Sequence, residues 1–305
     1  MAGSFPVSPA RGDGRPQLFA VLATLGSYLP RIVVIGGWVP TLYREFGGLA
    51  WRGRLSLTTE VDVLTVPPIP VEGVPLDEAL EARGFAPGRT DAPSAVWTQP
   101  GVAGAQIEFL TPLVGPQRGE GTTLPFDGHG GVGGLQLEGL DLLAEFTNQI
   151  DIPVRTGGET RVLRVRVPTL GAYVVNKAET FPRRRQHGAG DNPKRAKDLL
   201  YLRDVAAAGD AVVERVLGDV RVILGAPKRV FSVRKARNNL QMTCLGTLYP
   251  DAVAAAVGML AEREAMDHTA ALADVRGYLS DLRDLLDEVL PARRRGHHSA
   301  GRGKA

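Results

Sequence analysis

Two acidic residues lie two positions apart in a short apolar stretch of the chain. Glu60 and Asp62 flank Val61 in the sequence TTEVDV. Alternate residues of a β-strand point to the same face of its sheet, so both carboxylates would share one side. Like charges at this spacing disfavour each other's ionised form, whereas Mg²⁺ takes carboxylate oxygens as ligands. The pair therefore predicts a metal site; the alternative is a solvated acidic face on an edge strand.

A glycine pair precedes the acidic stretch. The run RIVVI at 31–35 is apolar and β-branched, which is typical of a buried strand. Gly36 and Gly37 then allow a sharp turn and leave room for another group to approach the backbone. Residues 38–46 have apolar side chains at helical spacing. This order of strand, turn, helix and acidic strand favours the metal site over a solvated face.

A basic region follows later in the chain. Pro168 and Thr169 are typical of a helix start, and they predict a helix over 170–180 that contains Lys177. From Lys177 to Lys197 there are seven basic and two acidic residues, a net charge of +5. Opposite an acidic pair, such a concentration could neutralise a triphosphate. The alternative is an exposed helix face with i,i+4 ion pairs.

These two blocks resemble the nucleotidyltransferase superfamily, which shares the polymerase-β-like core, and within it the AbiEii group of type IV toxin–antitoxin systems. The resemblance implies that the Gly36-Gly37 turn and Thr58 hold a nucleoside triphosphate. It also implies that Glu60 and Asp62 bind Mg²⁺ or Mn²⁺. The chain departs from the commonest pattern twice, with Gly37 in place of Ser and Glu60 in place of Asp.

The resemblance extends over residues 31–208 and includes the basic region. It implies that Lys177 contacts the nucleotide phosphates, with Arg183 and Lys197 as further contacts. It also implies that Asp198 lines the site and either orients Lys177 or assists proton transfer. The three consecutive arginines at 183–185 are equivalent in this pattern.

A third acid, Glu108, lies in the sequence QIEFL of a predicted strand at 105–110. In the resembled fold a later strand supplies a carboxylate beside the first pair, as a metal ligand or general base. Glu108 is the candidate for that role; the alternative is an ordinary solvent-facing glutamate. The glycine-rich residues 115–134 match no phosphate-binding fingerprint and predict a mobile loop, in which His129 has no partner by spacing.

Composition limits the class of protein. The chain has 305 residues, of which 44% are hydrophobic, so it can form a sizeable core. The single cysteine, Cys244, excludes an internal disulfide and fits a reducing compartment, so we expect a cytoplasmic protein. No apolar run is long enough to span a membrane. The formal charge is +3, but residues 292–305 carry five positive charges and no acid, which leaves the body at 3 − 5 = −2.

These patterns predict an α/β fold: a polymerase-β-like nucleotidyltransferase core with a small mixed sheet, followed by a helical C-terminal domain. Apolar stripes predict helices over 212–224, 228–245, 251–259 and 267–289. The expected divisions are a flexible N-terminus at 1–16, the nucleotidyltransferase-like domain at 17–167, the helical domain at 168–290 and a basic disordered tail at 291–305.

The expected activity is Mg²⁺-dependent transfer of a nucleoside monophosphate from an NTP to an acceptor hydroxyl. Toxin-like relatives imply the 3′ end of a tRNA as acceptor and an antitoxin protein as partner. A small aminoglycoside-like acceptor is one alternative, which the weakly acidic body favours. A catalytically degenerate nucleotide-binding protein is another, because Glu60 departs from the usual pattern.

Overall fold

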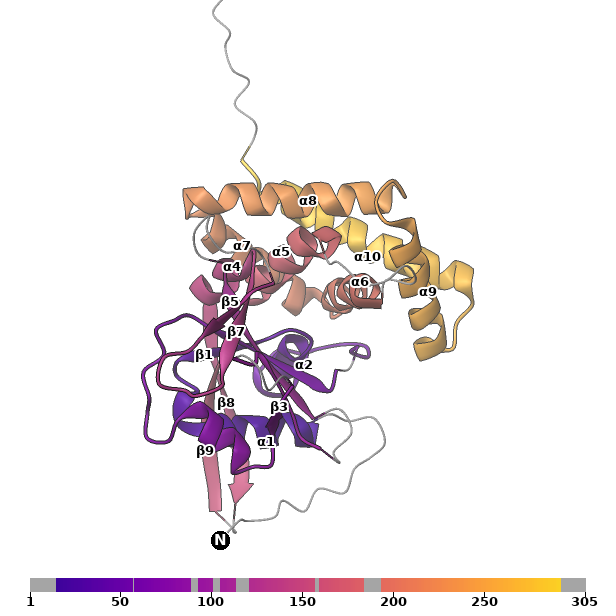
Figure 1. Cartoon of the computed structure of the whole chain (residues 1–305). Helices are drawn as coiled ribbons and strands as arrows, with labels where there is room; N and C mark the ends of the chain where they lie inside the picture. The colour runs from indigo at the N-terminus through magenta and orange to yellow at the C-terminus, as the bar shows by residue number, and fades with distance from the viewer. Residues whose placement is uncertain are drawn as a thin grey trace, which may run out of the picture.

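The computed structural model shows a mixed sheet with its helices and, stacked against them, a bundle of helices (Figure 1). The sheet and helices α1 to α3 form the indigo and purple half, and helices α5 to α10 form the pink to yellow half. The structure describes residues 15–56, 58–88, 93–100, 105–113, 121–156, 159–183 and 193–291. The predicted fold class, a mixed α/β region followed by a helical region, is confirmed.

The sheet contains seven strands in the described part of the chain. Its main path is β1-β2-β5-β4-β3; β7 also pairs with β5, and β6 pairs with β7. The β2–β5 and β5–β7 pairs are parallel, and the other pairs are antiparallel. The strands are β1 (Ile32–Ile35), β2 (Glu60–Thr65), β3 (Ala86–Pro87), β4 (Val96–Thr98), β5 (Gln106–Pro112), β6 (Thr123–Pro125) and β7 (Gly133–Leu137).

The two faces of the sheet differ in chemistry. Residues that pair across neighbouring strands point to the same face of the sheet. The register therefore forms rows of apolar side chains on the face that packs into the core. The members of two such rows are at most 1% exposed: Val34, Val63 and Phe109, then Val61, Ile107 and Trp97. Asp62 and Glu108, which pair with each other, lie on the opposite face. The apolar rows anchor the sheet in the core and leave the acidic positions on the other side.

Four helices and a hairpin complete the first half. The helices are α1 (Arg15–Leu25), followed by a 3₁₀ turn at Gly26–Tyr28, then α2 (Trp38–Phe46), α3 (Leu76–Glu81) and α4 (Leu140–Glu145). The hairpin consists of β8 (Thr147–Thr156) and β9 (Glu159–Pro168) and packs against β1. The predicted helix over 38–46 has the bounds of α2. The first helix begins at Arg15, inside the segment 1–16 that we expected to be flexible.

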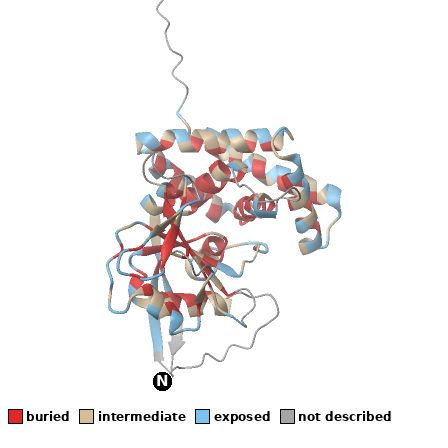
Figure 2. Cartoon of the chain, in the orientation of Figure 1, coloured by how far each residue is buried: buried red, intermediate tan, exposed pale blue. Residues whose placement is uncertain are grey.

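The bundle begins with α5 (Leu170–Thr180), whose bounds are those predicted. The Thr169 hydroxyl accepts the N–H of Ala172 at 3.2 Å and caps this helix. A 3₁₀ turn (Phe181–Arg183), α6 (Pro193–Ala206), α7 (Asp210–Leu224), a 3₁₀ turn (Pro227–Arg229), α8 (Val230–Cys244), α9 (Pro250–Glu264) and α10 (His268–Val289) follow. Helix α5 packs against α6, α7 and α8, and much of it is buried (Figure 2).

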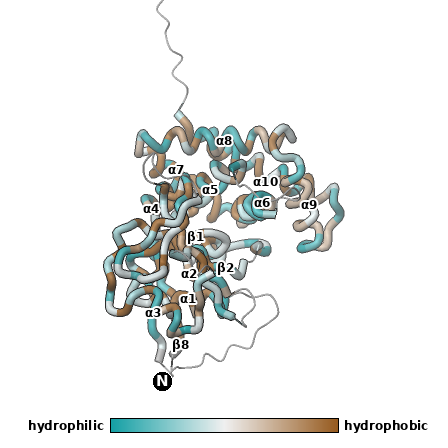
Figure 3. The backbone as a smooth tube through the Cα atoms, in the orientation of Figure 1, coloured by the Kyte–Doolittle hydropathy of each residue, from teal (hydrophilic) through white to brown (hydrophobic). Residues whose placement is uncertain are grey.

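The final helices carry their apolar residues on the inner side, as the sequence predicts. Leu279, Leu282 and Leu286 of α10 are each at most 2% exposed, and polar residues alternate with them along the tube (Figure 3). None of the helices in the described ranges combines the length and the apolar character that crossing a membrane requires.

Cys244, at the end of α8, is half-buried, and burial raises the pKa of its thiol.

The glycine-rich segment differs from the prediction of a mobile loop, which is wrong for residues 121–134. These residues form β6 and the start of β7. A side chain at Gly133 would come within 2.8 Å of the Leu124 carbonyl oxygen, and one at Gly134 within 2.8 Å of the Phe126 ring. The glycines therefore permit close packing. Residues 115–120 of the expected loop lie outside the described ranges.

His129 belongs to this packed region and has a structural role. Its side chain is fully buried, and its Nδ1 accepts the Leu76 N–H at 3.2 Å. Its Nε2 lies 2.9 Å from the Ile69 carbonyl oxygen, and its ring packs edge-on against Tyr28. Both ring nitrogens are thus used to hold neighbouring segments of the chain.

The segment that leads into the acidic strand lies along helix α6. The Arg52 N–H donates to the Ala208 carbonyl at 2.9 Å, just beyond the end of the helix. The Ser56 N–H and hydroxyl donate to the Asp204 carboxylate at 2.7 and 2.8 Å. These contacts lie about one helical turn apart, so the direction of β2 is tied to α6.

Asp204 also joins α6 to the last helices. Its side chain is fully buried and accepts hydrogen bonds from Arg263 of α9 at 2.7 and 2.9 Å. Arg203, next to it, pairs with Asp274 of α10 at 2.6 and 2.8 Å. A buried charge network with all of these partners in place is costly to break, since removing one member leaves the others desolvated.

We expect Asp204→Asn to lower the free energy of unfolding by about 3 kcal/mol, because the arginines would then lie beside a neutral amide. Asp284→Asn is the matched control. Asp284 also accepts from an arginine, Arg283, but its side chain is 62% exposed, so we expect a change of at most about 0.5 kcal/mol. Urea unfolding of both variants measures the difference, and equal midpoints would contradict a structural role for Asp204.

Candidate active site

The Gly36-Gly37 turn and the acidic strand form one local structure. Strands β1 and β2 are antiparallel with Ile35 opposite Asp62, so the turn after β1 begins beside the Asp62 side chain. Gly36 has φ +70, a conformation that disfavours any other residue. A Cβ at this position would overlap the Asp62 carboxylate, with its Cγ 3.0 Å away. Glycine is therefore required both by the backbone and by the position of the acid.

Gly36→Ala should lower the transfer rate at least about 100-fold, because the new methyl group displaces the Asp62 carboxylate. Gly48→Ala is a matched control. Gly48 has φ +69, but a Cβ there would meet no atom within 4 Å. Both variants carry the same backbone cost of about 1–2 kcal/mol, whereas only the first disturbs an acid. Initial-rate measurements on both test this, and similar rates would show that the Gly36 contact is unimportant.

A third carboxyl group lies beside Asp62. Glu108 of β5 is the cross-strand partner of Asp62, and both are half-buried on the same face. Glu60 lies two residues before Asp62 on that face and is exposed. Within the described ranges, however, no group of three or more Asp, Glu, His or Cys side chains is arranged to hold a metal ion.

The donor set nevertheless fits a hard cation that also takes oxygens from a ligand. Glu60 and Asp62 lie on the same side of β2 and offer carboxylate oxygens, the donors that Mg²⁺ prefers together with phosphate oxygens. The Asp62 carboxylate lies directly against the turn. A metal held by two side chains would have open positions for such phosphate oxygens.

A buried ion pair joins helices α5 and α6. Lys177 of α5 donates to Asp198 of α6 at 2.5 Å, and the two side chains are 6% and 5% exposed. The Lys177 ammonium also lies 5.8 Å from the centre of the Tyr173 ring and 5.2 Å from that of Tyr201. Such contacts with aromatic faces stabilise a desolvated cation. The arrangement keeps a positive charge in an enclosed position.

Tyr201 connects this ion pair with the turn. A Cβ at Gly37 would lie 2.8 Å from the Tyr201 ring carbon Cζ and 2.8 Å from the Thr58 methyl group, with the Tyr201 hydroxyl oxygen closer still. The Thr58 side chain thus lies at the same turn as the Tyr201 hydroxyl. Burial raises the pKa of Tyr201, and the Asp198 and Asp62 carboxylates raise it further. Asp62, the turn and Lys177 are thus all close to one side chain.

The structure also explains one departure from the commonest motif. A serine at position 37 would collide with Tyr201, so glycine is the residue that fits there.

The sequence analysis did not identify Tyr201 as a site residue, although its position relative to Asp198 is a signal. It lies three residues after Asp198 on the same helix, and residues at this spacing share a helix face.

The other predicted residues are placed as follows. Thr58 lies at the turn, since its methyl group would be 2.8 Å from a Cβ built on Gly37. Lys197 is exposed, and adjacent residues of a helix point about 100° apart, so it projects away from buried Asp198. Arg183 forms an ion pair with Glu138, in the connection between β7 and α4. The structure thus does not show Arg183 beside Lys177. The other two arginines lie outside the described ranges.

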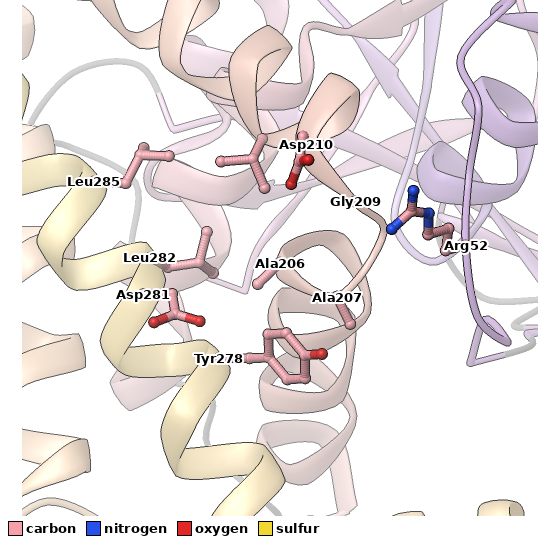
Figure 4. Close-up of a pocket in the computed structure, with 10 residues that line it drawn as sticks. Arg52, Ala206, Ala207, Gly209, Asp210, Tyr278, Asp281, Leu282 and Leu285 are labelled. Atoms are coloured by element: carbon pink, nitrogen blue, oxygen red, sulfur yellow. The ribbon is translucent and has the colours of Figure 1, made fainter.

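A cavity of about 490 Å³ opens elsewhere, between the end of α6, the start of α7 and helix α10. Arg52, Asp210, Tyr278 and Asp281 contribute polar groups to its wall (Figure 4). None of the predicted site residues lines it. We therefore locate the candidate site from the converging motif residues and not from this cavity.

A mixed sheet with a glycine turn against an acidic strand, and a tyrosine that contacts both the turn and a buried lysine, is the arrangement expected of a nucleotidyl-transferring enzyme. The chain belongs to a nucleotidyltransferase family: a family model described as "Nucleotidyltransferase" matches residues 17–218, well over half of the chain. Comparisons with curated proteins and with solved structures find no match. The family supports a transferase that moves nucleoside monophosphates, and its match ends before α8.

Proposed function

We propose that the protein is a Mg²⁺-dependent nucleotidyltransferase that moves a nucleoside monophosphate from an NTP to an acceptor hydroxyl. The observation that carries the proposal is the convergence at Tyr201. The Gly36-Gly37 turn, the Asp62 carboxylate and the Lys177 ammonium all lie around this side chain. An enclosed cation and an acid, both close to one side chain at a glycine turn, suit a ligand that is itself a metal-bound polyanion.

The triphosphate would bind at the start of α2. Gly37 is the N-cap of this helix, and the N–H groups of a first helical turn, with the helix dipole, attract phosphate. Lys177 would supply positive charge from the opposite side by exchanging its bond to Asp198 for one to a phosphate oxygen. Asp198 would hold Lys177 in place before the nucleotide binds.

Glu60 and Asp62 would hold the metal ion. Mg²⁺ bound there would neutralise phosphate charge as a Lewis acid. Glu60 has a longer side chain than the usual Asp, and its exposed position allows it to reach toward the phosphates beyond Asp62. The acidic face of the sheet would thus be the metal side of the site.

The reaction would proceed by displacement at the α-phosphorus. The acceptor oxygen forms a bond to this phosphorus while the bond to the β-phosphate oxygen breaks, and pyrophosphate leaves. The hydroxyl proton passes to a carboxylate, for which Glu108 and Asp198 are the candidates. Lys177 stabilises the negative charge that develops on the leaving pyrophosphate.

For the acceptor, we propose RNA, with the 3′ end of a tRNA as in AbiEii-like toxins and an antitoxin as the partner. The supporting observation is the net charge of +5 that the sequence carries from Lys177 to Lys197. The negative charge of the body without its tail favours a small cationic acceptor of the aminoglycoside kind as the second candidate.

Incubation with each NTP tests both the transfer reaction and the choice of acceptor. The wild-type protein, Mg²⁺ and NTPs labelled at the α-phosphate are mixed with total RNA or with aminoglycosides. We expect label in RNA from an α-labelled NTP and none from the same NTP labelled at the γ-phosphate. Label in the aminoglycoside alone would select the second acceptor. Binding without transfer to either would indicate a degenerate nucleotide-binding protein, and absence of binding would reject the proposal.

A further inference from the structure

The Tyr201 hydroxyl occupies the space beside the turn where any side chain at position 37 would have to lie. Its oxygen and its ring carbon Cζ are the nearest and the joint next-nearest atoms to a Cβ built on Gly37. The side chain is only 6% exposed, although it ends at a polar group. A largely buried side chain that brings its polar group against a glycine turn calls for an explanation.

The ring of Tyr201 already has a packing role. Its face receives the Lys177 ammonium at 5.2 Å, and a phenylalanine ring could provide the same surface. The hydroxyl adds a polar group at the turn, beside Gly37 and Thr58. The ring therefore explains the lysine contact, whereas the hydroxyl needs a separate role.

The hydroxyl is suited to donate a hydrogen bond to an anion. Burial raises its pKa, as do the Asp198 and Asp62 carboxylates, so it keeps its proton throughout the neutral range. A phenol hydroxyl has one proton that it can donate to an acceptor oxygen. The hydroxyl lies beside Gly37, the N-cap of α2, and a helix N-terminus favours an anionic ligand.

We propose that the Tyr201 hydroxyl donates a hydrogen bond to a phosphate group of the NTP bound at the Gly36-Gly37 turn. This inference rests on the proposed function and adds a nucleotide-contacting residue to it. Tyr201 supplies the side-chain donor at the turn, and position 37 is glycine because this donor reaches the turn from α6. The bundle thereby contributes a second group, after Lys177, to the recognition of the triphosphate.

Tyr201→Phe tests the proposal, because it keeps the ring under Lys177 and removes only the hydroxyl. We expect about 10-fold weaker binding of an α,β-methylene NTP with Mg²⁺, as for the loss of one hydrogen bond to a charged group. The KM for the NTP should rise by a similar factor, with a smaller change in kcat, because a contact made equally in ground and transition states affects binding alone. The urea midpoint should stay close to that of the wild-type protein.

Tyr43→Phe is the matched control. Tyr43 lies on α2 itself, and its buried hydroxyl donates to the Pro168 carbonyl at 3.0 Å and accepts from Asn148 at 2.8 Å. This variant should lose stability but bind the nucleotide analogue as tightly as the wild-type protein. Calorimetric titrations with the ATP, CTP, GTP and UTP analogues compare all three proteins.

The possible failures are distinguishable. If the wild-type protein binds an analogue and Tyr201→Phe binds it equally well, the inference is overturned while the proposed function stands. If Tyr43→Phe loses as much affinity as Tyr201→Phe, the effect comes from general loosening and the inference is also overturned. If the wild-type protein binds none of the four analogues, both the proposed function and the inference fail.

Discussion

Asp62→Asn should reduce nucleotidyl transfer on the order of 1,000-fold, which corresponds to about 4 kcal/mol of transition-state stabilisation. The substitution keeps the shape of the side chain beside Gly36 but removes the charge that a metal ion requires. Glu60 and Glu108 lose a negatively charged neighbour on their face of the sheet, which offsets stability lost with the contacts of the Asp62 carboxylate, so the urea midpoint should change little. Loss of activity without loss of stability identifies a functional and not a structural acid.

The matched control is Asp151→Asn. Asp151 is also an aspartate on a strand, β8, but it pairs with Arg164 at 3.4 Å, far along the hairpin, with 59% of its side chain exposed. We expect its transfer rate to stay within twofold of the wild type. Initial rates measured over a range of Mg²⁺ concentrations compare the two variants. A rate for Asp62→Asn within tenfold of the wild type would refute the metal role.

Lys177→Met should affect both activity and stability. Met has nearly the length of Lys and fills the space beside the two tyrosine rings, but the Asp198 carboxylate then stays buried without the ammonium. Removing one member of a buried pair costs about 3–5 kcal/mol of folding free energy. Transfer should fall at least about 1,000-fold, because charge on the leaving pyrophosphate is no longer compensated.

The double variant Lys177→Met/Asp198→Asn separates these two effects. Replacing both charges removes the uncompensated carboxylate, so most of the lost stability should return. Transfer should remain as low as in Lys177→Met, because the cation is still absent. Urea unfolding and the transfer assay on the same preparations provide the two readouts. Transfer that recovers together with stability would mean that the lysine has only a structural role.

The elements that surround the site were predictable because their signals are local. Helix α5 begins after Thr169, whose side chain caps it, and ends before Pro182, so both of its bounds follow from neighbouring residues. The alternation in TTEVDV places Val61 in the core and the two acids on the other face. The pairing of Asp62 with Glu108 agrees with the expected later strand.

The rest of the site could not be predicted, because it depends on contacts between distant segments. Nothing in the sequence indicates that the Tyr201 hydroxyl reaches Gly37. The two residues are separated by more than half of the described chain. The Ser56–Asp204 bond is of the same kind. Arg183 had the charge expected of a phosphate contact, but its partner Glu138 is set by the packing of α4 on α5. Glycine-rich composition concealed β6 and β7, because it does not distinguish tight packing from mobility.

The Asp204 network has a consequence for how this protein can be divided. Asp204 pairs with Arg263, and its neighbour Arg203 pairs with Asp274. Both partners follow the end of the family match at residue 218. The segment entering β2 is attached to the same carboxylate. A shortened chain that ends with the family match would therefore keep Asp204 but lack Arg263 and Asp274, which balance the charges of Asp204 and Arg203. The C-terminal helices belong to the same folding unit as the chemistry, and they cannot be treated as a detachable appendage.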